Sequence, residues 1–138
     1  MSGEENKALI RRMTEEIFNK KNVDALGDFM AGDMVDHNPP PTDKPGLKGL
    51  KDAFRIFFSA LPDLSVQVDD VIAEGDKVVM RVTTTGTHQG DFMGITANGK
   101  KVSFGEIHVV RFDGGKMVEH WGIADQMGMM QQLGVVPS

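Results

Sequence analysis

The sequence predicts an α+β fold in which helices precede a curved antiparallel sheet. Up to Pro62, apolar residues recur every three or four positions, which is the spacing of amphipathic helices. After Pro62 they alternate with polar residues, which is the spacing of strands, and glycine-containing turns separate the runs. Helices and strands segregated in this way pack as helices over one face of a sheet. Because a curved sheet covered by helices keeps an open mouth, we expect a cone-shaped domain with a small-molecule pocket.

Three helices are predicted in the first half of the chain. The first covers residues 2–22, where Ser2 caps the amino end and two glutamates occupy the first turn. The second is short and covers residues 23–30. The third covers residues 47–61, carries a strongly apolar face and ends before a proline. Between the second and third helices, His37 leads into a proline run that forbids helix, so the chain is extended there.

Four long strands are predicted in the second half. They cover residues 65–74, 77–87, 102–112 and 116–123. Gly75-Asp76 and Asn98-Gly99 are tight-turn signals, and the second is the strongest hairpin signal in the chain. A short helix over residues 128–134 closes the sequence. Since no linker or repeat divides these elements, residues 1–138 are predicted to form one domain.

Composition narrows the function classes. The 138 residues are 40% hydrophobic and 25% charged, with net charge −5 and scattered basic residues, so nucleic acid is not an expected partner. The chain has no cysteine, which removes thiol nucleophiles and zinc–thiolate sites and fits a cytoplasmic location. No apolar run approaches the roughly 20 residues of a membrane span, so no membrane partner is expected. The four histidines lack metal-site spacing and no glycine-rich phosphate motif occurs, so we expect no metal and no cofactor.

The segment 105–125 is the richest in candidate functional residues. A two-residue turn at Gly114-Gly115 would place Phe112 opposite Met117 and His108 opposite Trp121. Side chains alternate between the faces of a strand, which defines one set on each face. The first set comprises Glu106, His108, Val110, Phe112, Met117, Glu119, Trp121, Ile123 and, if the strand continues, Asp125; the second comprises Val109, Arg111, Val118 and His120. A slip of one residue would exchange the sets.

We assign the first set to the concave face because Phe112, Trp121 and Ile123 make it the more apolar one. Glu106, His108 and Asp125 would then be polar groups inside a largely apolar cone. Buried polar groups need partners, and burial makes a carboxylate a better base. The hairpin therefore predicts a general base that works without a metal.

Several motifs in order along the chain resemble those of the SnoaL-like polyketide cyclase family, whose members are often described as predicted ester cyclases of the nuclear transport factor 2-like superfamily. The motifs are FFSALPD at 57–63, AEGDKVV at 73–79, GTHQG at 86–90, NGKKV at 98–102, GKMVEHW at 115–121, Asp125 and QQLG at 131–134. Each is weak alone, but the ordered set covers nearly the whole chain and is specific.

The resemblance implies a cone-shaped nuclear transport factor 2-like (cystatin-like) α+β barrel, usually a homodimer formed through the sheet. It also implies ring closure by intramolecular aldol condensation, without cofactor or metal. In the family an aspartate on the last strand removes the proton from carbon, and that position matches Asp125. A histidine helps to hold the oxygens of the substrate, and His108 matches it. The tyrosine that contributes a phenol in the family has no counterpart, because this chain has no tyrosine.

The remaining candidates bind substrate. Trp121, Glu106, Phe112 and Ile123 are predicted to line the pocket, His88 to lie near its rim, and His37 to line its mouth or to order the proline loop. Asp125 has an alternative role as the cap of the following turn, and His108 as a hydrogen-bonded core residue. Three functions remain open: a cyclase or isomerase of the lyase or isomerase class, a non-catalytic small-molecule binding protein, and a hydrolase or hydratase that uses the same aspartate.

Overall fold

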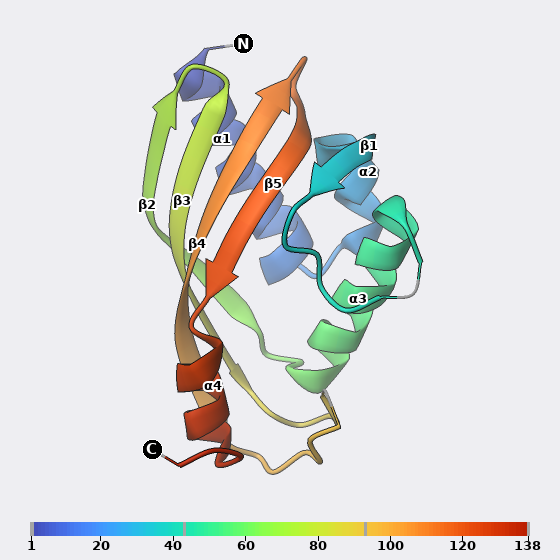
Figure 1. Cartoon of the computed structure of the whole chain (residues 1–138), viewed down its shortest axis with the longest axis vertical. Coiled ribbons are helices and arrows are strands. Elements are labelled where there is room, and N and C mark those ends of the chain that lie inside the picture. Colours follow the sequence, from blue (N-terminus) through green and yellow to red (C-terminus); the bar gives the residue numbers. More distant parts are fainter. Residues whose placement is uncertain (1, 43, 93, 138) are drawn as a thin grey trace.

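The computed structural model describes residues 2–42, 44–92 and 94–137, which form one curved, unclosed sheet with helices against it (Figure 1). The strands are β1 Met30–Asp36, β2 Ser65–Glu74, β3 Lys77–Thr87, β4 Lys101–Asp113 and β5 Lys116–Ala124. They lie in the order β1-β5-β4-β3-β2, and every neighbouring pair is antiparallel except β1 with β5. The predicted α+β class is confirmed.

The predicted helices are confirmed with small shifts at their ends. Helix α1 spans Gly3–Met13 and continues as a π-helical turn over Thr14–Asn19, and Ser2 caps it as predicted. The other helical elements are a 3₁₀ turn at Val23–Ala25, α2 at Leu26–Phe29, α3 at Gly46–Ala60 and α4 at Gln126–Leu133. None of the helices in the described part of the chain is long and apolar enough to cross a lipid bilayer.

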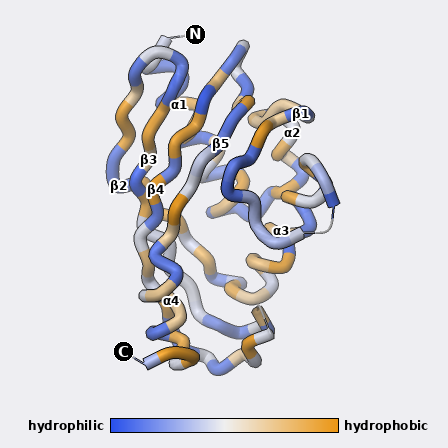
Figure 2. The backbone as a smooth tube through the Cα atoms, viewed as in Figure 1, coloured by the Kyte–Doolittle hydropathy of each residue, from blue (hydrophilic) through white to orange (hydrophobic). Residues whose placement is uncertain are grey.

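The core lies between α1 and the inner face of the sheet, where α1 packs across β2 and β3 (Figure 1). Strand β3 alternates strictly between buried and more exposed residues, as does much of β4. Figure 2 shows hydrophobic and hydrophilic stretches following one another along these strands. Residues at the centre of this layer have almost no exposed surface: Ile10, Ile17, Val78, Val82 and Val110. The inner face of β4 is therefore the face of its even-numbered residues.

Two sequence predictions about connections are wrong. The second helix was expected to reach residue 30 and no strand was expected before Pro62, but residues 30–36 form the edge strand β1, which pairs in parallel with β5. Asn98-Gly99 is not a two-residue hairpin, because β3 ends at Thr87 and β4 begins only at Lys101. The backbone of His88 bonds to Lys100 and Gly99 instead, so a longer loop returns beside the end of β3.

The register predicted for the β4–β5 hairpin holds at its turn and fails beyond it. Phe112 faces Met117 across a turn in which both glycines have positive φ, as expected. The next pair is Arg111 with Glu119, so Val118 is an extra residue on β5 and forms a β-bulge. Every later residue of β5 is displaced by one. The predicted concave orientation of Trp121 and Ile123 is therefore wrong, and His120, Gly122 and Ala124 share the inner face instead.

Candidate functional site

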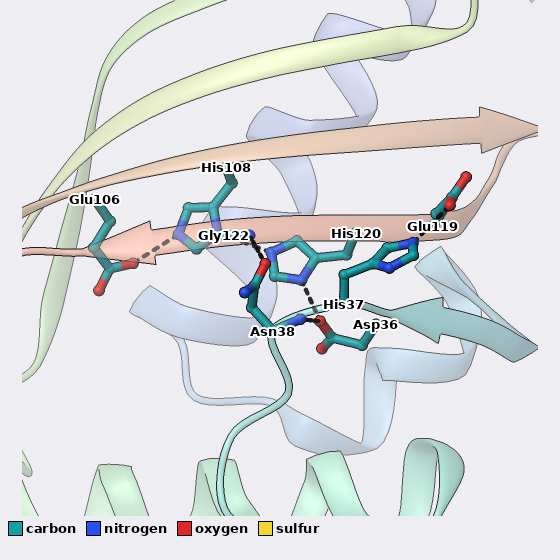
Figure 3. A network of polar contacts seen from close by, with 8 residues as sticks. All are labelled: Asp36, His37, Asn38, Glu106, His108, Glu119, His120 and Gly122. Atoms are coloured by element: carbon teal, nitrogen blue, oxygen red, sulfur yellow. Dashed lines mark hydrogen bonds and ion pairs between the residues drawn. The ribbon is translucent and has the colours of Figure 1, made fainter.

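Four titratable side chains form a continuous hydrogen-bonded row on the inner face of the sheet (Figure 3). Asp36 Oδ1 lies 2.8 Å from His120 Nδ1, at the end of β1. His120 Nε2 lies 2.9 Å from His108 Nδ1, which joins β5 to β4. His108 Nε2 lies 2.7 Å from Glu106 Oε2. We call these four side chains the acid–base row.

Strand pairing fixes the positions of the row. Asp36 pairs with His120 across β1 and β5, and His108 pairs with Gly122 across β5 and β4. Although all four side chains lie on the inner face, their exposed fractions are 13% for Asp36, 17% for His120, 22% for His108 and 19% for Glu106. Purely structural positions on the same face, such as Val110, are almost completely covered. The row therefore borders a solvent-accessible space instead of filling the core.

The three contacts of the row require three protons, one for each hydrogen bond. Two neutral imidazoles supply only two, so the third proton makes one ring an imidazolium or resides on a carboxyl group. Without it, one of the three contacts would bring two lone pairs together, for example those of the two ring nitrogens at 2.9 Å. The row can therefore hold one exchangeable proton. With this third proton the row is an acid, and without it the row is the conjugate base.

Asp36 is held as a carboxylate by its surroundings. Burial has the largest influence on its pKa and raises it, but the hydrogen bond and charge of His120, with the backbone N–H of Asn38, together outweigh burial. The net result is a pKa below the ordinary carboxyl value. A lowered pKa in the folded state stabilises the fold above the ordinary pKa, and this contribution is lost as pH falls through the lowered value.

The substitution His120→Leu is expected to raise the pKa of Asp36. It removes the hydrogen bond and the charge that lower this pKa against the effect of burial. Leucine fills the same space with an apolar side chain, so the burial of Asp36 remains. The shift is measured by following the ¹³Cγ signal of Asp36 against pH by NMR. The carboxyl of Asp63, which accepts hydrogen bonds from Thr87 at another part of the fold, serves as the internal control and keeps its pKa. An unchanged Asp36 titration would contradict this electrostatic assignment.

Residues 36–38 attach the end of β1 to β5 in three directions. Asp36 joins the row, and the backbone N–H of Asn38 donates to Asp36 Oδ1 at 3.1 Å while Asn38 Oδ1 accepts from the backbone of Gly122 at 3.0 Å. His37 points to the other side, where its ring stacks on Trp121 at 4.7 Å and its Nε2 lies 2.7 Å from Glu119 Oε2. These contacts hold Asp36 against His120.

A cavity of about 440 Å³ adjoins Asp36 between β1, the proline loop and α3. Its walls are mostly apolar and include Met34, Pro39, Pro40, Leu47 and Leu50. This volume lies within the range of small-molecule pockets, and a few polar groups on apolar walls are typical of them. A second cavity of about 380 Å³ opens at the hairpin end of the sheet and includes Asn6, Asp76 and Arg111 in its lining, away from the row.

The structure brings together only some of the predicted site residues. Glu106 and His108 share the row, and Phe112 faces inward but is packed in the core. His88 also faces inward and is almost fully buried, and neither ring nitrogen has a hydrogen-bond partner among the described residues. On the outer face lie His37, Trp121 and Ile123, the last with 77% of its surface exposed.

Asp125 occupies the position that its alternative prediction described. Strand β5 ends at Ala124, and Asp125 is the exposed N-cap of α4, where its Oδ1 accepts from the backbone N–H of Gly128 at 2.9 Å. The expected continuation of the strand onto the concave face is therefore wrong. A catalytic role for Asp125 stays a prediction, which experiment can compare directly with that of Asp36.

Asp36, Asn38 and His120 were not identified as site residues from the sequence. Residues 36–38 are three consecutive polar residues between the apolar residues 34–35 and the proline run. This was a usable signal, because polar residues in a segment that follows a strand often carry function. His120 was assigned to the outer face only because the bulge was not foreseen. Among the described residues, no group of three or more acidic or histidine side chains is arranged to hold a metal ion.

Comparison with known proteins agrees with this fold. Residues 8–133 match the SnoaL-like polyketide cyclase family. The aklanonic acid methyl ester cyclase DnrD of Streptomyces peucetius is 27% identical over 135 residues, which span 91% of this chain and 88% of the relative. The structure of TsrD from Streptomyces laurentii aligns with a TM-score of 0.88 at 29% identity and covers 99% of both chains. A SnoaL-like polyketide cyclase from Agrobacterium tumefaciens aligns with a TM-score of 0.73 at 25% identity, covering 91% of this chain and 95% of its own. Since the family match extends over most of its length, this chain belongs to the SnoaL-like polyketide cyclase family.

Proposed function

We propose that this protein is a cofactor-independent cyclase that transfers a proton from an acidic carbon of a polyketide and thereby closes a ring. The observation that carries the proposal is the acid–base row, in which two imidazoles connect two carboxylates beside an accessible space. Positioned acid–base groups of this kind contribute roughly 10²–10⁴ to a rate. The row therefore takes the place of the single aspartate predicted from the sequence.

The proton balance of an aldol closure suits this row. In its deprotonated state the row takes the proton from the carbon next to a carbonyl, which leaves an enolate. The enolate carbon attacks a second carbonyl of the same molecule, so one C–C bond forms and the attacked C=O becomes an alkoxide. The row then returns one proton to the alkoxide oxygen. No electron is gained or lost, and the row ends with the number of protons with which it began.

The chemical class of the substrate follows from the cavity and from the relatives. Apolar walls of about 440 Å³ beside Asp36 fit a flat, largely carbon skeleton with a few oxygens. The curated relatives are aklanonic acid methyl ester cyclases, so a polyketide methyl ester is the first substrate to test. Because the chain has no tyrosine, no phenol can donate a hydrogen bond to the carbonyl oxygens of the substrate.

The direct test is to incubate the purified protein with aklanonic acid methyl ester and analyse the product by liquid chromatography and mass spectrometry. Aldol closure changes the retention time and leaves the molecular mass unchanged, because it is an isomerisation. A product heavier by one water would indicate a hydratase, and the free acid formed with release of methanol would indicate a hydrolase. Binding measured by calorimetry without any conversion would indicate a small-molecule binding protein. Any of these results would contradict the proposal for this substrate.

The outer face of the sheet supports a second proposal, that two copies of the chain associate through it. The registered neighbours Ile72, Val79, Val109 and Trp121 form an apolar row across four strands, and Ile107 pairs with the exposed Ile123 beside it. This outer surface is more apolar than the inner face of β5, which carries His120, Gly122 and Ala124. An exposed apolar patch of this kind is typical of an interaction surface, and a second copy offers the same patch in a two-fold arrangement.

Ile123→Asp is expected to convert the dimer into a monomer, because it places a charge at the most exposed position of this patch. Molar mass is measured by size-exclusion chromatography with light scattering. The control is Ile56→Asp, which makes the same change at another exposed isoleucine, 57% exposed, on helix α3 away from the sheet surface. Dissociation by both variants, or by neither, would contradict association through the sheet.

A further inference from the structure

Gly122 lies directly under the contact between the two histidine rings. It pairs with His108 across the β4–β5 ladder, and it is the next residue of β5 after His120 that lies on the same face of the sheet. A Cβ atom at Gly122 would stand 2.6 Å from His108 Nδ1, 3.0 Å from His108 Cε1 and 3.0 Å from His120 Cε1. Contacts below 3.0 Å force a neighbour to move, so the rings can approach each other here only above a residue without a side chain.

The backbone does not by itself require glycine at this position. Gly122 is not among the glycines with positive φ, so an alanine would meet no conformational strain of that kind. Its backbone N–H donates to Asn38 Oδ1 at 3.0 Å, and the Asn38 N–H donates in turn to Asp36 Oδ1. The main chain of Gly122 thus supports one end of the row, while its missing side chain leaves space for the middle.

We propose that Gly122 is a positioning residue that lets His108 and His120 share a proton, so that the four side chains of the row act as one acid–base unit. A side chain at this position would separate the rings and divide the row into two independent pairs, Asp36 with His120 and Glu106 with His108. Each pair keeps the proton of its own hydrogen bond, but the third proton, which lies between the two rings, no longer has both a donor and an acceptor nitrogen. The consequence for turnover rests on the proposed cyclase function, whereas the consequence for the shared proton does not.

The experiment compares Gly122→Ala with Gly105→Ala. Gly105 lies on β4 in the same hairpin, also without a positive φ, and a Cβ atom there would have no heavy atom outside its chain neighbours within 4 Å. The two variants therefore make the same chemical change in the same sheet, with and without a collision. Samples carry ¹⁵N-labelled histidine, and the protons on the ring nitrogens are recorded by NMR.

The wild type and Gly105→Ala are expected to show a proton signal that correlates with Nδ1 of His108 and Nε2 of His120. Gly122→Ala is expected to lose that signal while keeping the two signals of N–H groups bonded to carboxylates. Its kcat is expected to fall by on the order of 10²-fold, the scale of one acid–base contribution, with KM changed much less. A Gly122→Ala protein with the inter-ring signal and the turnover of Gly105→Ala overturns the proposal.

A second measurement covers the case in which Gly122→Ala folds poorly. The collision is mainly with the His108 ring, so the decrease in melting temperature caused by Gly122→Ala should largely disappear in a His108→Ala background. Equal decreases in both backgrounds would mean that the glycine serves the backbone alone, which overturns the proposal.

The two proposals fail separately. If the inter-ring proton signal behaves as expected but no polyketide is cyclised, the proposed function is wrong and the positioning role of Gly122 stands. If polyketides are cyclised and the signal is the same in both alanine variants, the cyclase stands and the role of Gly122 is wrong.

Discussion

His120→Leu is expected to lower turnover of the cyclisation by about 10²–10⁴-fold, the largest effect of any substitution in the row. His120 contacts Asp36 through one ring nitrogen and His108 through the other, so it is the member that connects the Asp36 carboxylate of β1 to the rest of the row. Leucine keeps most of the volume but carries no proton, so it separates the carboxylate of β1 from the imidazole of β4. Because proton transfer occurs in the transition state, the loss is expected in kcat and in kcat/KM together.

The measurement is steady-state turnover of the polyketide ester, with the fold of the variant verified by its backbone NMR spectrum. A folded His120→Leu protein that retains more than a third of wild-type kcat would contradict the account. Substrate affinity, measured by calorimetry, is expected to change far less than turnover, since the apolar walls of the cavity are untouched.

The second large effect is expected from Asp36→Asn, which is compared with Asp125→Asn. The amide at residue 36 removes the negative charge and disturbs an oxygen that accepts from both His120 and the backbone of Asn38. Turnover is expected to fall by at least about 10²-fold. Asparagine caps a helix about as well as aspartate, so Asp125→Asn should leave both the fold and the turnover within threefold of wild type.

This pair of variants separates the base implied by the family resemblance from the base favoured by the geometry. Both substitutions replace one carboxylate by its amide, and both proteins are assayed with the same substrate. If Asp125→Asn abolishes turnover while Asp36→Asn preserves it, the cap residue is the base and the row is structural. A joint loss would mean that both carboxylates take part.

The periodicity of the sequence was sufficient for most of the fold. The residue ranges of β2 and β3 match the predicted 65–74 and 77–87, because unbroken alternation and a glycine turn leave few alternatives. The capping of α1 by Ser2 was also predictable, since both partners of the capping box lie within four residues. Local signals therefore gave the elements whose stabilising contacts are themselves local.

The orientation of β5 was beyond prediction for two physical reasons. The extra residue Val118 leaves no mark in the sequence, because a bulge depends on twist and packing instead of residue type. The rule that the more apolar face points inward then supported the wrong choice, since Trp121 and Ile123 lie on an open face whose apolar character we attribute to a second copy.

The acid–base row was beyond prediction because its contacts are not local. Asp36 and His120 are 84 positions apart and meet only through the parallel pairing of β1 with β5. Strand β1 itself gave no clear alternation, and its residues include a glycine and two aspartates that are unusual in strands. Glu106 and His108 were predicted to share the pocket because they stand two residues apart on one strand, which is a local relation.

The central claim, that the row transfers a proton at carbon, is tested most directly by hydrogen exchange at the acidic carbon of the substrate in D₂O. Wild-type protein is expected to introduce deuterium at that carbon in recovered substrate or product, and His120→Leu is expected to slow this by about 10²-fold or more. Asp125→Asn should exchange at the wild-type rate. Exchange that is unaffected in His120→Leu but lost in Asp125→Asn would contradict the account and return the base to the end of β5.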